Sequence, residues 1–297
     1  VSKMLRMMTS DLFLSEIQQY TLLISAVGHD LGHPGVNNGF LSETSDELAL
    51  SYNDRSPLEN MHCAKLYSIT HHPETNCFKM FTKDQYKDAR KQTIEAILHT
   101  DMTNHMAMVK ELNMVYQVNS EVFQPTSRGR TSRKSSRRAS SRFKSVHGTE
   151  VDVFNQAEIK VLTIDCVLHS ADVSNPCRTW EVSREWAWRC LEEFFAQGDQ
   201  EKQLGVPVQF LNDRDTLNRP NSQIGFIEFM IAPFFAAQIR LWPGLRSLGD
   251  NLSNNIRNWE DLWVEEINPA DEEKEKVSYR VLKVTDSLEA AATRAPI

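Results

Sequence analysis

The chain has 297 residues, 40% of them apolar and 25% charged, an ordinary globular composition that excludes collagen-like, wholly disordered and disulfide-stapled proteins. Its most apolar stretch, 224–237, contains Glu228 and Pro233 and falls short of the roughly 20 uncharged residues that cross a bilayer, so we expect no membrane span. The net charge of −7 offers no general basic surface for a phosphate backbone, so we expect no nucleic-acid partner.

The predicted elements are all helices. Residues 11–31 carry apolar side chains at helical spacing, and the pattern stops at the breakers Gly32, Pro34 and Gly35. No region shows the strict alternation of a half-buried strand, so the sequence predicts an all-α fold. The same helical period recurs in 48–69, 92–118, 158–171, 183–195, 223–241 and 252–267.

A Ser/Arg-rich run at 121–148 interrupts this pattern. Within it, 126–147 holds eight of the 33 basic residues and no acid, so the rest of the chain carries 25 bases against 40 acids. Such a composition cannot offset the entropy of ordering, and we expect an insertion loop between two helices. Residues 270–297 are charged and then Ala-rich, which predicts a charged tail that ends as a surface helix. We interpret 1–297 as one helical domain.

The five cysteines are odd in number and show no two-residue spacing of the kind that zinc and redox motifs use. This pattern favours a reduced compartment, and we expect a cytoplasmic protein. The cysteines are Cys63, Cys77, Cys166, Cys177 and Cys190.

His29 and Asp30 follow the apolar run 21–27 and should therefore lie at a buried helix end. A buried carboxylate is costly unless it is paired or coordinates a cation, and an imidazole beside a carboxylate suits zinc, iron, manganese or magnesium. Asp172 follows a second apolar helical face, so we expect Asp30 and Asp172 to converge. The alternative is that the polar groups cap helices or make core hydrogen bonds, but two clusters of the same form favour a metal centre.

A dense polar set at 52–62 precedes another predicted helix. Glu59 and His62 fall one turn apart there, where they could orient metal ligands and bound water. The spacing fits equally well a capping network in which Ser56 is the N-cap and Glu59 lies three residues later. Asp101 ends a third apolar run and by itself carries no prediction.

Taken in this order, these motifs resemble the catalytic domain of the class I cyclic-nucleotide phosphodiesterases, within the wider superfamily of His-Asp metal phosphohydrolases. The resemblance spans nearly the whole chain apart from the basic loop and the tail. A generic His-Asp hydrolase would have no reason to share the segment from Gln223 to Phe226. The segments that carry the resemblance are 29–35 with Asn38, 47–50, 58–60, 100–102 with His105, 171–176, 192–195, 197–199 with Glu201, 222–227 and 255–259.

The resemblance implies an all-α domain with a deep pocket that holds two divalent ions, typically zinc in the tighter site and magnesium or manganese in the looser one. Equivalents of His29, Asp30 and Asp172 bind the first ion, and Asp30 also bridges to the second. A hydroxide between the ions attacks phosphorus, because two close cations lower the pKa of the water and neutralise charge on the phosphoryl oxygens. The implied activity is hydrolysis of cyclic AMP or cyclic GMP to the 5′-monophosphate, which terminates cyclic-nucleotide signalling.

The resemblance also implies roles around the ions and the base. His33, Glu59 and His62 would hold metal-bound water and the ligands. The equivalent of Gln223 hydrogen-bonds the purine edge, and Phe226 stacks on the purine face. Because an amide can present its donor or its acceptor, Gln223 does not decide between cyclic AMP and cyclic GMP. The other residues implied in the nucleotide pocket are Asn175, Met102, Cys190, Leu191 and Phe194.

The chain departs from the family pattern in two places. The family carries a His-Asn-x-x-His segment just before the point that matches Val1, whose first His protonates the leaving 3′ oxygen and whose second binds the first ion. We expect an N-terminal part beyond this sequence to supply it. The other departure is Cys190, where many relatives have a branched aliphatic residue, and we expect a roomier, softer wall. We assign no replacement acid among His62, His99, His105, His147 and His169.

Three other functions stay open at this stage. A regulatory module would hold the nucleotide through Gln223 and Phe226 without hydrolysing it. A different phosphohydrolase on the same scaffold, such as a nucleotidase, would prefer purine monophosphates. A helical interaction domain would bind no metal.

The basic loop contains Arg137-Arg138-Ala139-Ser140, which fits the Arg-Arg-x-Ser pattern of basophilic kinases. Phosphorylation of Ser140 would add a charge of about −1.5 to −2 within a run of cations and could dock the loop against neighbouring arginines. Ser140 is therefore a candidate regulatory site and such a kinase a candidate partner for the loop at 126–147. The alternative is a solvated insertion with no regulatory role.

Overall fold

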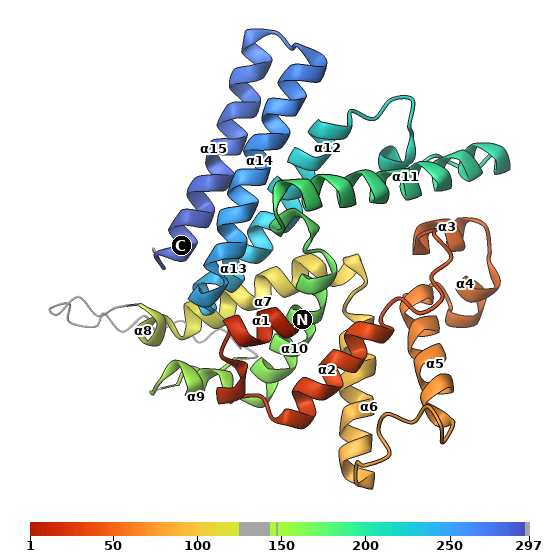
Figure 1. Cartoon of the computed structure of the whole chain (residues 1–297), viewed down its shortest axis with the longest axis vertical. Helices are drawn as coiled ribbons and strands as arrows, with labels where there is room; N and C mark the ends of the chain where they lie inside the picture. Colours follow the sequence, from red (N-terminus) through yellow and green to blue (C-terminus); the bar gives the residue numbers. More distant parts are fainter. Residues whose placement is uncertain (125–142, 147, 295–297) are drawn as a thin grey trace, which may run out of the picture.

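The computed structural model describes residues 1–124, 143–146 and 148–294. Every regular element in those ranges is a helix, which confirms the predicted all-α fold (Figure 1). The first helices are α1 (Ser2–Met7), α2 (Glu16–Gly28), α3 (Asn38–Glu43), α4 (Glu47–Tyr52), α5 (Pro57–His71), α6 (Lys83–Leu98), α7 (His105–Val118) and α8 (Ser120–Phe123). The later ones are α9 (Glu150–Phe154), α10 (Ala157–Asp172), α11 (Trp180–Leu204), α12 (Arg219–Phe226), α13 (Ala232–Leu241), α14 (Arg246–Ile267) and α15 (Asp271–Ala292).

The main core is a continuous cluster of buried side chains that draws on residues from Met4 to Ala291. Helix α10 lies inside it, since every residue from Leu162 to Ser170 is buried. Helix α13 packs on α7, α14 and α15. Figure 1 shows α14 and α15 as a long pair at one end of the molecule and α5 and α6 at the other, with α7 and α10 between them.

Helix α2 is shorter than the predicted helix over 11–31, because a capping box fixes its start. The backbone N–H of Gln18 donates to Ser15 Oγ at 3.3 Å, and Ser15 N–H donates to Gln18 Oε1 at 3.0 Å. Residues Ser10–Leu12 form a separate 3₁₀ turn before this cap. The helix ends at Gly28, so His29 and Asp30 lie directly after its last turn.

Two of the predicted helices are each broken into two. Residues 48–69 form α4 and α5, separated by Asn53, Asp54 and Ser56 in left-handed conformations with φ of 53°, 59° and 45°. Residues 92–118 form the end of α6 and all of α7, separated by a turn at Asp101. The two breaks meet, because Ser56 Oγ donates to Asp101 Oδ2 at 2.7 Å.

The predicted helix over 223–241 is helical throughout, but its hydrogen-bonding pattern changes partway along. A π-helical turn, η5 (Ile227–Ile231), separates α12 from α13. Pro233 has no N–H to donate, so an α-helical hydrogen-bond ladder cannot run unbroken through this point. By length and composition alone 219–241 could cross a membrane, but 61% of its most apolar window is buried within the fold, as in the core helix of a globular protein.

The predicted charged tail is a long helix, α15, that contributes to the core. Its exposed face is charged, yet Val277, Val281, Val284 and Leu288 are buried against the rest of the molecule. Helix α15 packs on both α13 and α14. The tail is therefore a surface helix with one buried face, which its high charge concealed.

Most of the expected basic loop, including Ser140, lies outside the described residues. On the side before it, α8 ends at Phe123, which is buried in the core. On the far side, Phe143 is 3% exposed and joins the same core cluster. The chain is thus anchored close to both ends of the run.

Candidate active site

His29 and Asp30 reach the site because α2 approaches α5 closely at its last turn. A Cβ at Gly28 would lie 2.9 Å from Leu66 Cδ1 on α5, so a larger residue would push the helices apart. After Asp30 the chain turns at Gly32, whose φ of +72° favours glycine. These two glycines position the His-Asp pair at a tight helix end.

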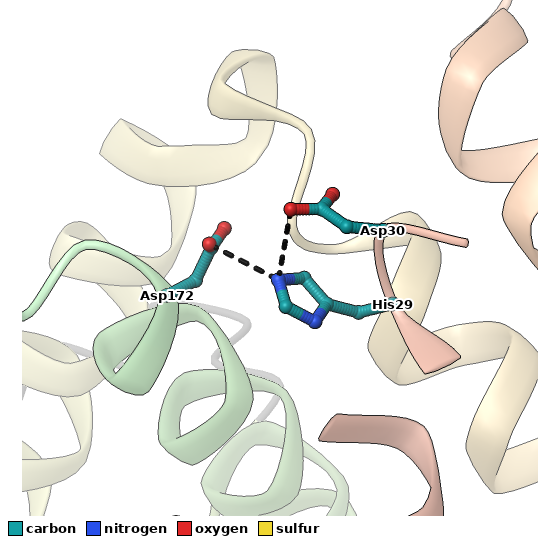
Figure 2. Close-up of side chains that lie close together, drawn as sticks. All are labelled: His29, Asp30 and Asp172. Atoms are coloured by element: carbon teal, nitrogen blue, oxygen red, sulfur yellow. Dashed lines mark hydrogen bonds and ion pairs between the residues drawn. The ribbon is translucent and has the colours of Figure 1, made fainter. Parts of the chain in front are cut away.

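Figure 2 shows His29, Asp30 and Asp172 converging from two helix ends. His29 Nε2 lies 3.2 Å from Asp172 Oδ1 and 3.3 Å from Asp30 Oδ2. One ligand atom from each of the three residues falls within 4.8 Å of the others. The structure therefore brings together the acids at the ends of two separate apolar helices.

Hydrogen bonding fixes the role of each His29 nitrogen. Nδ1 lies 2.9 Å from the carbonyl oxygen of Ala26 and must donate to it. In the neutral imidazole, Nε2 is then a lone-pair acceptor that faces two carboxylate oxygens, an arrangement that needs a proton or a cation at its centre. Burial would lower the pKa of His29, but the hydrogen bond and charge of Asp172, with the charge of Asp30, raise it to about 9.

The three residues fit a divalent cation. One imidazole nitrogen and two carboxylates form a mixed borderline and hard donor set that suits zinc, manganese or magnesium. Three protein ligands with a position left for water are also typical of catalytic zinc sites. Asp30 is the most accessible of the three, with its side chain 61% exposed, so it can offer a second oxygen outward.

His62 and His33 lie beside Asp30. His62 Nδ1 donates to the carbonyl oxygen of Leu31 at 2.9 Å, and its Nε2 lies 3.7 Å from Asp30 Oδ1. Burial lowers the pKa of His62, which favours the neutral ring and an acceptor Nε2. The His33 ring stacks on His62, and its Nδ1 accepts from Gly35 N–H at 3.0 Å, which leaves the proton on Nε2. The pair thus offers one acceptor and one donor.

Glu59 is held by Asn38 and not by a capping box. Asn38 Nδ2 donates to Glu59 Oε2 at 2.9 Å, while Asn38 Oδ1 accepts from Leu58 N–H at 3.0 Å. Ser56 is the N-cap of α5, as the capping alternative placed it, but its side chain makes no capping hydrogen bond, so the predicted capping network does not form. Burial raises the pKa of Glu59, and the charges of Asp101 and Asp30 add to the shift although the bond from Asn38 opposes it.

The residues expected around the base lie on two helices that an ion pair joins. Arg219 Nη2 on α12 lies 2.7 Å from Glu192 Oε1 on α11. Gln223 follows Arg219 by one helical turn and is 8% exposed, whereas Phe226 ends α12 and is partly buried. The candidates on α11 differ in exposure: Cys190 is exposed, Phe194 is intermediate and Leu191 is buried.

One residue of α11, Cys190, interacts electrostatically with a metal-ligand candidate. Burial raises the pKa of the Cys190 thiol, and the charges of Glu193 and Asp172 raise it further. Cys190 is therefore close enough to Asp172 to feel its charge. Met102, at the start of a 3₁₀ turn after Asp101, is 41% exposed.

Asn175 lies on the turn η3 (Asn175–Cys177), which α14 holds from behind. Asn255 Nδ2 donates to the carbonyl oxygens of Pro176 at 2.7 Å and Arg178 at 2.8 Å, and Asn251 Nδ2 donates to that of Cys177 at 3.0 Å. Sequence reasoning did not assign this clamp. Its signal is the pair of asparagines one turn apart on the buried, otherwise apolar face of α14.

A second hydrogen-bond network that sequence reasoning did not assign is built on α11. It ties the start of α3 and the segment after α11 to that helix. Glu201 is 1% exposed and accepts hydrogen bonds from Gln197 Nε2, Asn212 Nδ2 and Gln209 N–H. Gln197 Oε1 in turn accepts from Asn37 N–H at 2.9 Å, next to the Asn38 that holds Glu59. The feature of the sequence that could have indicated this network is the pair of polar residues one helical turn apart, Gln197 and Glu201.

Three other histidines, His99, His105 and His169, have structural partners. His105 Nδ1 and His169 Nε2 lie 2.8 Å apart, and His105 Nε2 donates to the carbonyl oxygen of Met230 at 3.0 Å. His99 Nδ1 donates to the carbonyl oxygen of Glu95. His147 lies outside the described residues. Among the described residues, none of these rings is placed as a replacement acid.

Comparisons with known proteins point to one enzyme family. A family model described as 3′5′-cyclic nucleotide phosphodiesterase matches residues 1–252. The chain is 34% identical over 235 residues to the high affinity cGMP-specific 3′,5′-cyclic phosphodiesterase 9A of Drosophila melanogaster. It is 35% identical over 255 residues to the human high affinity cAMP-specific and IBMX-insensitive 3′,5′-cyclic phosphodiesterase 8A. These matches cover 79% and 84% of this chain.

Among solved structures, the phosphodiesterase domain of Salpingoeca rosetta rhodopsin phosphodiesterase matches with a TM-score of 0.70 and 26% identity. This match covers 91% of this chain and 70% of that one. The chain spans only 13% of the length of the fly relative and 28% of the human relative. The likeness thus concerns one part of those longer proteins.

Proposed function

The chain belongs to the 3′,5′-cyclic nucleotide phosphodiesterase family, and from this premise we propose that it is a catalytic domain that hydrolyses 3′,5′-cyclic nucleotides to 5′-monophosphates. The observation that carries the proposal is the convergence of His29 Nε2 with the carboxylates of Asp30 and Asp172. A phosphodiester carries negative charge, and a cluster of acceptors alone would repel it. The same cluster around divalent cations would attract it.

Each polar residue has a specific task in this proposal. His29, Asp30 and Asp172 would hold the first cation, and the outer oxygen of Asp30 would reach toward a second. When bound, two cations, zinc with magnesium or manganese, would lower the pKa of a shared water so that it attacks phosphorus and would neutralise charge on the phosphoryl oxygens. His62 Nε2 offers an acceptor beside Asp30, and the stacked His33 offers a donor.

Glu59 is the candidate for holding or passing on a proton of the attacking water. Its carboxyl is fixed by Asn38 and lies near enough to Asp30 for their charges to interact. Because burial raises its pKa, its carboxylate is a better proton acceptor than an exposed glutamate. No described residue is assigned as the acid for the leaving 3′ oxygen.

The nucleotide base would lie between α12 and α11, against Gln223, Phe226, Cys190, Leu191 and Phe194, with Asn175 near the base and Met102 in the same pocket. In the described part of the chain, no hydrogen bond fixes the Gln223 side-chain amide, so either of its orientations is available to a purine edge. We therefore propose cyclic AMP and cyclic GMP together as the substrate class. The named relatives include one cGMP-specific and one cAMP-specific enzyme.

The test is hydrolysis of both nucleotides in parallel, with magnesium or manganese present and again after chelation. Asp172→Asn should lower kcat/KM by at least about 100-fold, since it removes a ligand charge. Asp261→Asn, an exposed carboxylate on α14, is the matched control and should retain full activity. Equal loss in both variants would contradict the assignment of Asp172.

The competing functions give different results in the same experiment. Cyclic-nucleotide binding without turnover, also in a version extended upstream of Val1, would favour a regulatory module. Faster turnover of purine monophosphates than of cyclic nucleotides would favour a nucleotidase.

A further inference from the structure

A groove away from the candidate active site runs between α7 and α15 and has α13 as its floor. Helix α13 packs on both of its neighbours (Figure 1). The groove has a volume of about 490 Å³, and a water molecule's share of the liquid is about 30 Å³, so an oxyanion with several waters fits. Its lining residues are Lys110, Asn113, Met114, Gln117, Pro233, Ala236, Arg240 and Ser287.

The charges in this groove are all positive. Lys110 on α7 and Arg240 on α13 line it, and no acidic residue is among the described side chains that do so. A groove lined by two basic residues and no described acid is unusual in this chain. The net charge is −7, and eight of the basic residues lie in 126–147. An anion near the molecule would therefore be attracted to this groove more than to most of its surroundings.

Arg240 is the residue that points to a ligand. Its Nε is buried, and among the residues that the structure describes it has no hydrogen-bond partner and its guanidinium forms no ion pair with a carboxylate. Burial lowers the pKa of Arg240 although Tyr116 opposes the shift, which is consistent with a partly desolvated guanidinium. An unsatisfied buried donor usually marks a water or an ion that completes the site.

A neighbouring arginine shows what a compensated site looks like in the same region. Arg294 donates to the carbonyl oxygen of Arg240 and forms a two-pronged ion pair with Glu150, at 2.5 and 3.1 Å. The Arg294 guanidinium thus lies against the backbone at the end of α13 and has a carboxylate partner, whereas no described carboxylate pairs with Arg240. Arg240 lines the groove together with Lys110.

We propose that this groove binds a phosphate-class oxyanion, as inorganic phosphate or as a small phosphate monoester, between Arg240 and Lys110. A planar guanidinium matches the tetrahedral oxyanion with parallel N–H donors, and the ammonium adds a second charge. Ser287 and Gln117 supply neutral donors on the two walls. The Pro233 and Ala236 floor adds no competing charge.

The test is calorimetric titration with inorganic phosphate at constant ionic strength, chloride being the ion replaced. The protein is first treated with a chelator, so that phosphate cannot bind through cations at His29, Asp30 and Asp172. Wild type should bind phosphate at one site, Arg240→Gln should bind at least tenfold more weakly, and Lys110→Gln roughly three- to tenfold more weakly. Lys87→Gln, an exposed lysine on α6, should bind as wild type does.

Three outcomes would overturn the proposal. They are no phosphate binding by the chelated wild type, unchanged binding in both groove variants, and equal weakening in Lys87→Gln. Lys110 is exposed, so its variant keeps the test valid even if Arg240→Gln folds poorly. A parallel titration with glycerol 2-phosphate separates the sources: tighter binding than inorganic phosphate identifies an ester as the ligand, and weaker binding identifies the free ion.

Discussion

At the residue scale, the candidate metal centre depends on which nitrogen of His29 carries a proton. The carbonyl oxygen of Ala26 takes the proton of Nδ1, so Nε2 faces Asp30 and Asp172 as a lone pair or as a second N–H. A proton and a metal ion therefore compete for the same position. The raised pKa of His29, about 9, measures how strongly the two carboxylates favour the positive charge.

Zinc binding to the metal-free protein should therefore release close to one proton at pH 7 to 8, and the affinity should fall as the pH is lowered below about 9. Calorimetry in buffers of different ionisation enthalpy measures this release directly. The Asp261→Asn control should behave as wild type does. An enthalpy that is the same in every buffer would contradict the assigned state of His29.

The buried pair of His105 and His169 has pKa values shifted in the opposite direction from that of His29. His105 Nε2 donates to Met230, so its Nδ1 must accept, and His169 Nε2 must carry the proton that joins the rings. This arrangement holds when both rings are neutral, the state that burial favours by lowering the pKa of each. Burial and the neighbouring His105 lower the pKa of His169 from its ordinary 6.5 to about 4.

Acid should destabilise the fold through this pair. Between pH 6.5 and about 4 the unfolded chain binds a proton at His169 that the folded chain does not, so the free energy of unfolding falls as the pH falls, by on the order of 3 kcal/mol in all. Urea unfolding across this range checks it. His169→Gln should show a shallower slope, whereas His72→Gln, at an exposed position, should keep the wild-type slope. Equal slopes for His169→Gln and wild type would contradict the account.

At the element scale, helical periodicity predicted where helices occur but not where they break. The apolar pattern runs on through 48–69 and 92–118, whereas the structure interrupts both segments. A hydrogen bond between distant residues, Ser56 to Asp101, joins the two breaks, and helical periodicity does not encode such a contact. The ends of α2 and α10 were predictable, because His29, Asp30 and Asp172 follow long apolar runs, but the expected burial was wrong for both carboxylates, which are exposed. The clamps at Asn38 and Asn255 were not, since their hydrogen-bond partners lie on other elements that are distant in the sequence.

The Asn255 clamp should stabilise both the fold and the Asn175 turn. Asn255→Ala leaves the carbonyl oxygens of Pro176 and Arg178 buried without their donor, which should cost about 1 to 3 kcal/mol of unfolding free energy. We expect KM for cyclic nucleotides to rise more than kcat falls, because the turn that carries Asn175 loosens. Chemical denaturation and steady-state kinetics measure both, with exposed Asn254→Ala as the control. Wild-type stability in Asn255→Ala would contradict the clamp.

At the scale of the whole molecule, α15 completes the core and is not an appended tail. Its buried face packs on α13 and α14. Helix α13 follows directly after α12 and the π-helical turn, and α12 carries Gln223 and Phe226 of the proposed nucleotide pocket. Composition concealed this role, because charged residues dominate the exposed face. The same packing forms the groove at Arg240.

Truncating one buried side chain of α15 should therefore destabilise the entire fold. Leu288→Ala should lower the free energy of unfolding by about 2 to 5 kcal/mol, since Leu288 is 3% exposed. Leu282→Ala, at a position that is 54% exposed on the same helix, should change it by less than about 0.5 kcal/mol. Thermal or urea unfolding compares the two. Similar small effects would show that α15 is dispensable.

The central claim is that His29, Asp30 and Asp172 form the metal centre of a cyclic-nucleotide phosphodiesterase. The most direct measurement is the rate of cyclic AMP and cyclic GMP hydrolysis before chelation, after chelation, and after manganese or magnesium with zinc is restored, in wild type, Asp172→Asn and Asp261→Asn. We predict turnover that chelation abolishes and metal restores in wild type and Asp261→Asn, and that stays at least about 100-fold lower in Asp172→Asn. Turnover that survives chelation, or that Asp172→Asn leaves unchanged, would contradict the account.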